Sequence, residues 1–190
     1  QSPKFLSKEP VAPSAIPLKK PLDRLFNTPR ALSEEEIRDI IARFAYAAKV
    51  CKESGFTGVQ IHGAHGYLVS QFLSPTHNQR NDQWGGSLEN RMRFVTEVYK
   101  AIREAVGDAF PVGIKLNSAD FQKGGFTQED SMGVVKKLSE LGMDLIEISG
   151  GTYESPAMMG AKVKASTQAR EAYFLDYCEE VRKLVSSPLM

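Results

Sequence analysis

Three short apolar segments constrain the fold of this chain more than any other feature, because each is followed by glycine or polar residues and then by a helical pattern. The segments are residues 57–62, 111–117 and 144–149. Strands that alternate with helices form a parallel sheet covered by those helices. In such folds, the functional site lies at the carboxyl ends of the strands. The sequence therefore predicts an α/β protein whose site lies in the loops after these strands.

The helices expected around these strands begin at capping residues and end at glycines or polar residues. Ser33 followed by Glu36 has the spacing of a capping box, for example. The expected helices cover residues 33–55, 67–73, 87–107, 127–142 and 168–185. Residues 187–190 have the pattern of a strand that is just beginning.

The size of the chain limits how much of such a fold it can form. A complete barrel of eight β/α units needs about 250 residues, whereas this chain has 190. We therefore interpret residues 33–190 as central β/α units of a single barrel domain that is incomplete at both ends. Residues 1–32 contain Pro10, Pro13, Pro17 and Pro21, which interrupt any regular period, and they are predicted to form an extended connecting segment.

Composition excludes several classes of partner and location. With 24 basic and 23 acidic residues and a net charge of +1, the chain is not expected to bind nucleic acid. No apolar run approaches the ~20 residues of a membrane span, so a membrane protein is not expected. Cys51 and Cys178 lie in helical patterns without metal-ligand spacing, which favours a reducing, cytoplasmic location.

The loop after the first strand contains the residues most suited to chemistry. His62, His65 and Tyr67 lie where an apolar strand changes to glycines, and the chain has only 3 histidines. Because side chains alternate along a strand, Gln60 and His62 share one face, and the following residues bring His65 and Tyr67 beside His62. Imidazole and phenol groups can polarise a carbonyl oxygen and deliver a proton. This pattern indicates an enzyme site.

Other interpretations of these residues stay open at this point. His62 and His65 can be structural, hydrogen-bonded histidines, and Tyr67 can be an aromatic residue that packs at the start of a helix. The two histidines can also bind zinc, as in a metal-dependent barrel hydrolase, but no cysteine or carboxylate nearby offers a third ligand. No metal is therefore expected. His77 lies in a polar loop and is predicted to be structural.

Lys115 is a second candidate, because strand alternation places Gly113, Lys115 and Asn117 on the face away from the helices. A lysine that points into a barrel requires a carboxylate or an anionic ligand, since an unpaired buried ammonium costs several kcal/mol. Glu147 on the next strand can be that partner. The sequence leaves both a Lys115–Glu147 ion pair and an anionic ligand possible.

The chain closely resembles the old yellow enzyme family of flavin-dependent ene-reductases, also described as NADH:flavin oxidoreductases. The resemblance covers residues 33–155 well and rests on these motifs: Ile61-His62-Gly63-Ala64-His65-Gly66-Tyr67-Leu68, Gln71-Phe72-Leu73-Ser74-Pro75, Asn81-Asp82-Gln83-Trp84-Gly85-Gly86-Ser87-Leu88-Glu89-Asn90-Arg91, Val112-Gly113-Ile114-Lys115-Leu116 and Ile148-Ser149-Gly150-Gly151.

This resemblance implies a (β/α)8 TIM barrel of which the chain covers roughly strands 4 to 6. It implies an FMN enzyme that takes hydride from NADH or NADPH and transfers it to the C=C bond of an α,β-unsaturated carbonyl or nitro compound. His62 and His65 then bind the substrate oxygen, Tyr67 is the catalytic proton donor, and Lys115 contacts the flavin. The family usually has arginine at Lys115, and lysine keeps the charge without the bidentate geometry.

The expected partner is therefore a small activated alkene, and the protein is expected to be a homo-oligomer. The family's remaining strands, including those whose loops hold the FMN phosphate, are not found in these residues. The chain by itself is therefore expected to bind FMN weakly or not at all. An alternative is a catalytically silent barrel fragment that self-associates through its exposed strand edges or needs complementary segments.

Overall fold

The computed structural model describes residues 3–6, 9–155 and 168–190. For residues 168–174 it describes the backbone alone. Its centre is a parallel sheet of three strands in the order β3-β4-β5, namely β3 (Val59–Gly63), β4 (Val112–Asn117) and β5 (Leu145–Ser149). All three predicted strands are confirmed, with ends that shift by at most two residues. Leu189 forms a parallel bridge to Ile146, so the strand expected to begin at the end of the chain is confirmed as well.

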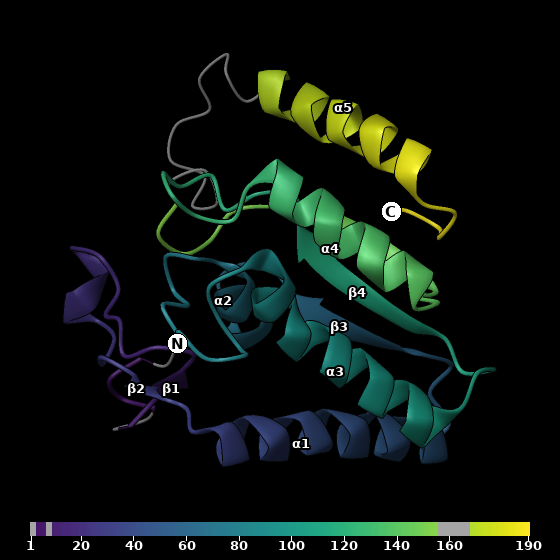
Figure 1. Cartoon of the computed structure of the whole chain (residues 1–190), viewed down its shortest axis with the longest axis horizontal. Helices are drawn as coiled ribbons and strands as arrows, with labels where there is room; N and C mark the ends of the chain where they lie inside the picture. Colours follow the sequence, from purple (N-terminus) through teal and green to yellow (C-terminus); the bar gives the residue numbers. More distant parts are fainter. Residues whose placement is uncertain (1–2, 7–8, 156–167) are drawn as a thin grey trace.

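The helices lie in a layer over one face of this sheet (Figure 1). They are α1 (Glu34–Glu53), the short α2 (Leu68–Leu73), α3 (Leu88–Val106), α4 (Gln128–Glu140) and α5 (Gln168–Leu184). Ser33 forms the predicted capping box, since its side chain accepts the N–H of Glu36 and the Glu36 carboxylate accepts the N–H of Ser33. Ser87 and Thr127 cap α3 and α4 in the same way, by accepting an N–H three residues later.

The core lies between the helices and the sheet. Val112, Ile114 and Leu116 of β4 are fully buried against the helices, as strand alternation predicted. Phe72 of α2 stacks on Phe94 of α3, with ring centroids 4.1 Å apart. Burial of one such side chain stabilises the folded state by about 2 kcal/mol. The opposite face of the sheet carries polar side chains and is the face of interest for function.

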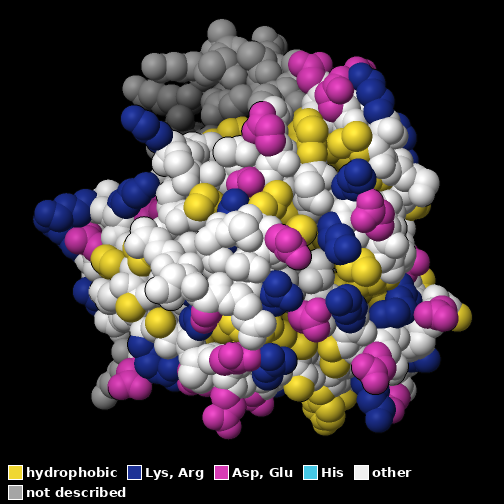
Figure 2. Space-filling view, viewed as in Figure 1, with side chains coloured by type: hydrophobic (Ala, Val, Ile, Leu, Met, Phe, Trp, Pro, Cys, Tyr) yellow, Lys and Arg dark blue, Asp and Glu magenta, His cyan; other side chains and the backbone are white. Residues whose placement is uncertain are grey.

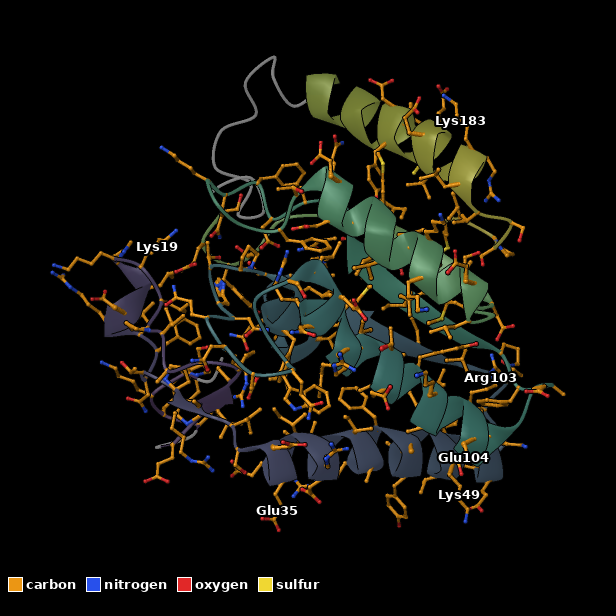
Figure 3. All side chains as sticks on the ribbon, viewed as in Figure 1. Lys19, Glu35, Lys49, Arg103, Glu104 and Lys183 are labelled. Carbon is orange, nitrogen blue, oxygen red and sulfur yellow. The ribbon has the colours of Figure 1, made fainter. Side chains whose placement is uncertain are left out.

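Arg103, labelled in the last turn of α3 in Figure 3, connects this helix to the sheet. Its guanidinium is 2.5 Å from the carboxylate of Asp144, which also accepts the N–H of Val112 at the start of β4. The guanidinium donates further hydrogen bonds to the backbone carbonyls of Gly107 and Phe110, in the loop between α3 and β4. This ion pair fixes the amino ends of β4 and β5, at the end of the sheet away from the loops of interest.

Residues 3–6 and 9–32 contain more regular structure than the extended connection that was predicted. The strands β1 (Val11–Ala12) and β2 (Arg30–Ala31) pair in parallel, and a 3-10 turn, η1 (Leu22–Arg24), lies between them. This segment lies beyond the carboxyl ends of the main strands (Figure 1). Arg80 holds it there, because its guanidinium donates to the carbonyls of Pro13 and Leu32. Strands of two residues are too short to produce a periodic pattern in the sequence.

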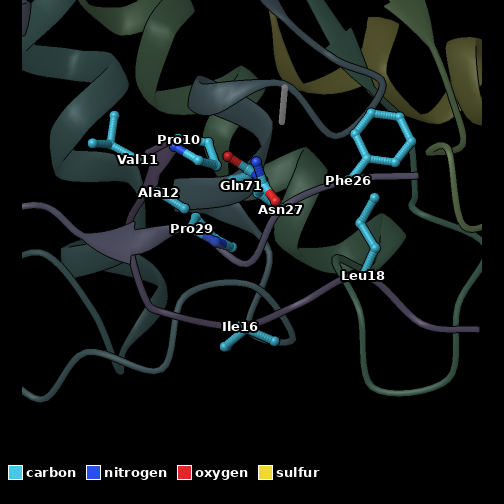
Figure 4. Close-up of a pocket in the computed structure, with 9 residues that line it drawn as sticks. All are labelled: Pro10, Val11, Ala12, Ile16, Leu18, Phe26, Asn27, Pro29 and Gln71. Carbon is cyan, nitrogen blue, oxygen red and sulfur yellow. The ribbon is translucent and has the colours of Figure 1, made fainter. Parts of the chain in front are cut away.

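A small hollow separates this segment from α2 (Figure 4). Gln71 extends into it from α2 and is 3% exposed. Its amide oxygen has no hydrogen-bond partner among the described residues. The other lining residues include Val11, Ala12, Leu18 and Phe26, so the hollow is mainly apolar.

On the face shown in Figure 2, basic and acidic side chains are interspersed and no continuous area of one sign is visible. This distribution agrees with the near balance of 24 basic and 23 acidic residues. Within residues 3–6, 9–155 and 168–190, no helix combines the length and the apolar character that crossing a membrane requires.

Candidate active site

We define the open face as the face of the sheet opposite the helices. Each strand contributes two polar side chains to it: Gln60 and His62 from β3, Lys115 and Asn117 from β4, and Glu147 and Ser149 from β5. The register of the sheet places His62, Lys115 and Glu147 opposite one another in a single row. Asn117 and Ser149 lie opposite each other, one row nearer the carboxyl ends of the strands. The open face is therefore polar in two successive rows.

His62, His65 and Tyr67 come together at the carboxyl end of β3, as the sequence predicted. The ring centroid of His62 is 5.2 Å from that of His65 and 4.9 Å from that of Tyr67. His65 has φ of 64°, a left-handed conformation that is uncommon outside glycine and is found at functional sites. This turn of the backbone brings His65 beside His62.

Asn117 supports this turn from β4. Its side-chain oxygen accepts the N–H of His65 at 3.2 Å, and its amide group donates to Asp120 and to the carbonyl of Gly151. Asp120 in turn accepts hydrogen bonds from Ser74 and Phe126. Asn117 and Asp120 are 1% and 0% exposed. These two buried side chains therefore join the loops that follow all three strands.

The electrostatics of the site favour neutral histidines. Burial and the nearby charge of Lys115 lower the pKa of His62, although Glu147 acts in the opposite direction. Burial, followed by His62 and Lys115, lowers the pKa of His65. The Nε2 atom of His65 is hydrogen-bonded to Ser149 Oγ at 2.7 Å. At neutral pH, both imidazoles are uncharged and each carries one N–H donor.

Lys115 forms the ion pair with Glu147 that the sequence left open. The Nζ atom is 2.7 Å from Oε1 of Glu147, and Gln60 donates to the other carboxylate oxygen at 3.0 Å. Lys115 and Gln60 together lower the pKa of Glu147, with the hydrogen bond from Lys115 as the largest cause. An ammonium group has three N–H donors, so the ion pair leaves donors of Lys115 for a further acceptor.

Sequence reasoning did not identify Tyr153, which lies in the loop after β5. Its hydroxyl is hydrogen-bonded to the hydroxyl of Tyr67, and the two rings meet edge to face with centroids 5.6 Å apart. The available signal was an aromatic residue shortly after Gly150 and Gly151, at the carboxyl end of a predicted strand. His77, which was predicted to be structural, is buried, with Nε2 3.2 Å from a carboxylate oxygen of Glu154.

The family of this chain follows from a comparison with known proteins. The family model described as "NADH:flavin oxidoreductase / NADH oxidase family" matches residues 4–190. The chain belongs to this family. FMN is the cofactor of this group of oxidoreductases, and old yellow enzyme homologues are among its structural neighbours. The resemblance seen in the sequence motifs is therefore confirmed.

Individual members of the family agree with this assignment. An NADH-dependent flavin oxidoreductase of Aspergillus parasiticus is 40% identical over 182 residues, which is 95% of this chain and 41% of that protein. A structure of 2-naphthoyl-CoA reductase with 2-naphthoyl-CoA has a TM-score of 0.82 and 34% identity, and covers 97% of this chain and 27% of that one. The old yellow enzyme homologue from Zymomonas mobilis has a TM-score of 0.72 and 27% identity, over 95% and 50%.

These matches confirm the fold as part of a (β/α)8 TIM barrel. The chain spans less than half the length of the Aspergillus relative. In a closed barrel, the open face of the sheet points to the interior. Among the residues that the structure describes, no three His, Cys, Asp or Glu side chains gather in an arrangement suited to a metal ion.

The donors of the open face fit one edge of a flavin ring. Lys115 supplies a positive charge with N–H donors to spare, and Gln60 supplies an amide group one row below it. The flavin's pyrimidine edge carries carbonyl oxygens and ring nitrogens, which accept such hydrogen bonds and are stabilised by a nearby cation. Glu147 makes the site less favourable for a negatively charged flavin, because its carboxylate compensates part of the positive charge of Lys115.

Proposed function

We propose that this chain provides the substrate-binding and proton-donating part of an FMN-dependent ene-reductase. The reaction is the transfer of hydride from NADH or NADPH, by way of FMN, to the activated C=C bond of an α,β-unsaturated carbonyl or nitro compound. FMN, when bound, supplies the hydride chemistry. The observation that supports the proposal most is the gathering of His62, His65 and Tyr67 at the carboxyl end of β3, with ring centroids 5.2 and 4.9 Å from His62.

In this proposal, His62 and His65 donate hydrogen bonds to the carbonyl or nitro oxygen of the substrate. Negative charge grows on that oxygen as the β-carbon receives hydride, and fixed N–H donors stabilise this charge in the transition state. The lowered pKa values keep both imidazoles neutral, so they act as hydrogen-bond donors and not as acids.

Tyr67 donates a proton to the α-carbon of the substrate. Its side chain is at the start of α2, it packs against His62, and it is 38% exposed, so a bound molecule can reach its hydroxyl. Lys115 is proposed to contact the flavin, where its charge stabilises negative charge on the ring. The protein is further proposed to be a cytoplasmic homo-oligomer.

The test is Tyr67→Phe in the full-length protein loaded with FMN, with the two half-reactions measured separately by stopped-flow absorbance. Loss of a general acid slows its step by about 100-fold or more. We expect reoxidation by 2-cyclohexenone to slow by that factor, while reduction by NADH changes less than twofold. Tyr46→Phe is the matched control, because Tyr46 is on α1 and 70% exposed. Equal loss in both half-reactions contradicts the proposal.

A further inference from the structure

We propose that Tyr153 is a positioning residue for Tyr67, which orients the Tyr67 hydroxyl and returns a proton to it after each turnover. The inference rests on the proposed role of Tyr67 as proton donor. It concerns the loop after β5, which the sequence motifs did not connect to chemistry. The two hydroxyl groups share a hydrogen bond although the residues are separated by 86 positions.

The packing around Tyr153 fixes where its hydroxyl lies. Its ring meets the ring of Tyr67 at 79°, with centroids 5.6 Å apart, and Phe26 lies 6.3 Å away at 47°. Phe26 belongs to the segment between η1 and β2, so Tyr153 is held between that segment and the site. Edge-to-face aromatic contacts of this kind orient rings with little freedom. The Tyr67 hydroxyl is therefore held by a partner that is itself positioned by packing.

The direction of the hydrogen bond decides what each phenol can do. A phenol has one proton and can also accept a hydrogen bond. Either hydroxyl can donate in this hydrogen bond. In the proposed arrangement Tyr153 donates to the Tyr67 oxygen, and the raised pKa of Tyr153 agrees with a phenol that stays protonated at neutral pH. The proton of Tyr67 is then free to point at the substrate.

The proton balance of the step is simple. The O–H bond of Tyr67 breaks as the C–H bond at the substrate α-carbon forms, which leaves a phenolate on Tyr67. The hydrogen bond from Tyr153 stabilises that phenolate, and the proton of Tyr153 then moves to the Tyr67 oxygen. Tyr153 is only half-buried, so water restores its proton. The new C–H bond uses the electron pair that hydride addition at the β-carbon leaves on the α-carbon, and the O–H pair stays on the Tyr67 oxygen. The proton transfers therefore change no oxidation state.

The kinetic test uses the full-length FMN protein with Tyr153→Phe, which keeps both ring contacts and removes only the hydroxyl. We expect reoxidation by 2-cyclohexenone to slow about tenfold, the effect of losing one hydrogen bond to a charged group. The solvent deuterium isotope effect on this step should increase, while reduction by NADH changes less than twofold. Tyr46→Phe again serves as the matched control and should behave as the wild type.

A second measurement tests the contact without any activity. Carbon NMR of ring-labelled tyrosine follows each phenol through its titration, and the Tyr153→Phe spectrum assigns the Tyr153 signal. We expect this signal to titrate above the ordinary value of about 10. Tyr67→Phe should lower it, because the hydrogen bond is the main cause of the raised pKa. Tyr46→Phe should leave it unchanged.

The outcomes separate the two proposals. If Tyr67→Phe leaves the alkene half-reaction intact, the proposed function is wrong and the role of Tyr153 is wrong with it. If Tyr67→Phe slows that half-reaction but Tyr153→Phe does not, or slows both half-reactions equally, only the role of Tyr153 is overturned. A Tyr153 signal that titrates at the same pH in Tyr67→Phe also overturns it.

Discussion

Lys115 Nζ lies 2.7 Å from Glu147 Oε1, in the row of the open face that also contains His62. The side chains of these residues are 29% and 20% exposed, so solvent reduces their interaction only in part. The pair gives a reason for a lysine at a position inside a barrel, because an unpaired ammonium there is unfavourable. It also sets how much positive charge is left for a bound flavin.

Glu147→Gln tests this balance of charge. Removal of the carboxylate leaves the charge of Lys115 uncompensated, which favours the more negative, reduced state of a bound flavin. We expect the flavin potential of the full-length protein to become more positive by about 30 mV, a tenfold change in a two-electron equilibrium. Lys115→Met should shift the potential to more negative values. Unchanged potentials in both variants would show that Lys115 does not contact the flavin.

The charge of Lys115 is also predicted to act on His62. Burial is the largest cause that lowers the pKa of His62, and the charge of Lys115 lowers this pKa further. Lys115→Met removes the positive charge and leaves Glu147 uncompensated, so both changes raise the pKa of His62. NMR titration of the imidazole signals measures this shift. Lys100→Met on α3, where Lys100 pairs with Glu97, should have no effect, and a fall in the pKa of His62 in Lys115→Met would refute the assignment.

His77 is predicted to make the fold sensitive to acid. Burial lowers its pKa below the ordinary value near 6.5, even though Glu154 lies 3.2 Å away and acts in the opposite direction. Between the folded and unfolded pKa values, the unfolded chain binds more protons, so stability increases with pH in that window. His77→Gln should reduce the gain in stability between pH 5.5 and pH 7.5. Denaturant unfolding at these two pH values measures the gain, and an identical gain in both proteins would exclude His77 as its source.

Asn117→Ala is predicted to destabilise the site and the fold together. It removes the acceptor for the His65 N–H and the donor to Gly151, and a buried group left without a partner costs about 1–3 kcal/mol. We expect a loss of about 3 kcal/mol in the free energy of unfolding. The matched control is Asn81→Ala in the exposed part of the loop before α3, which should change stability by less than about 0.5 kcal/mol. Similar losses in the two variants would contradict this role.

Two glycines are predicted to differ sharply in their tolerance of alanine. A Cβ at Gly85 would lie 2.5 Å from the carbonyl oxygen of Arg80, which is backbone and cannot move aside cheaply. A Cβ at Gly133 in α4 would meet only the end of the Leu88 side chain, at 2.9 Å. We expect Gly85→Ala to cost about 2 kcal/mol and Gly133→Ala to be close to neutral, since alanine favours helix. Denaturant unfolding compares them, and equal effects would contradict the difference in packing.

The regular elements were predictable because periodic patterns and caps determine them. The strands around Ile61, Ile114 and Ile146 and the capping box at Ser33 all appear where the sequence placed them. The grouping of His62, His65 and Tyr67 was predictable because it depends on one strand and one turn. These features are local, and local sequence carries the information that specifies them.

The contacts that join distant loops were not predictable in the same way. Asn117 was placed on the correct face of its strand, but its bonds to His65 and Gly151 depend on the conformation of two other loops. Tyr153 reaches Tyr67 only because parallel strands end at the same edge of the sheet. The pairing of β1 with β2 likewise depends on tertiary contacts, since strands of two residues have no pattern of their own.

The shared amide of Asn117 has a consequence for how such a site can diversify. One side chain contacts the loops after β3 and β5 and, through Asp120, the loop after β4. A loop exchanged by itself must therefore still match the Asn117 side chain, which also holds the other two loops. Recombination between family members should succeed when the three loops are transferred as one block, and chimaeras that split the block should lose the geometry of His65 first.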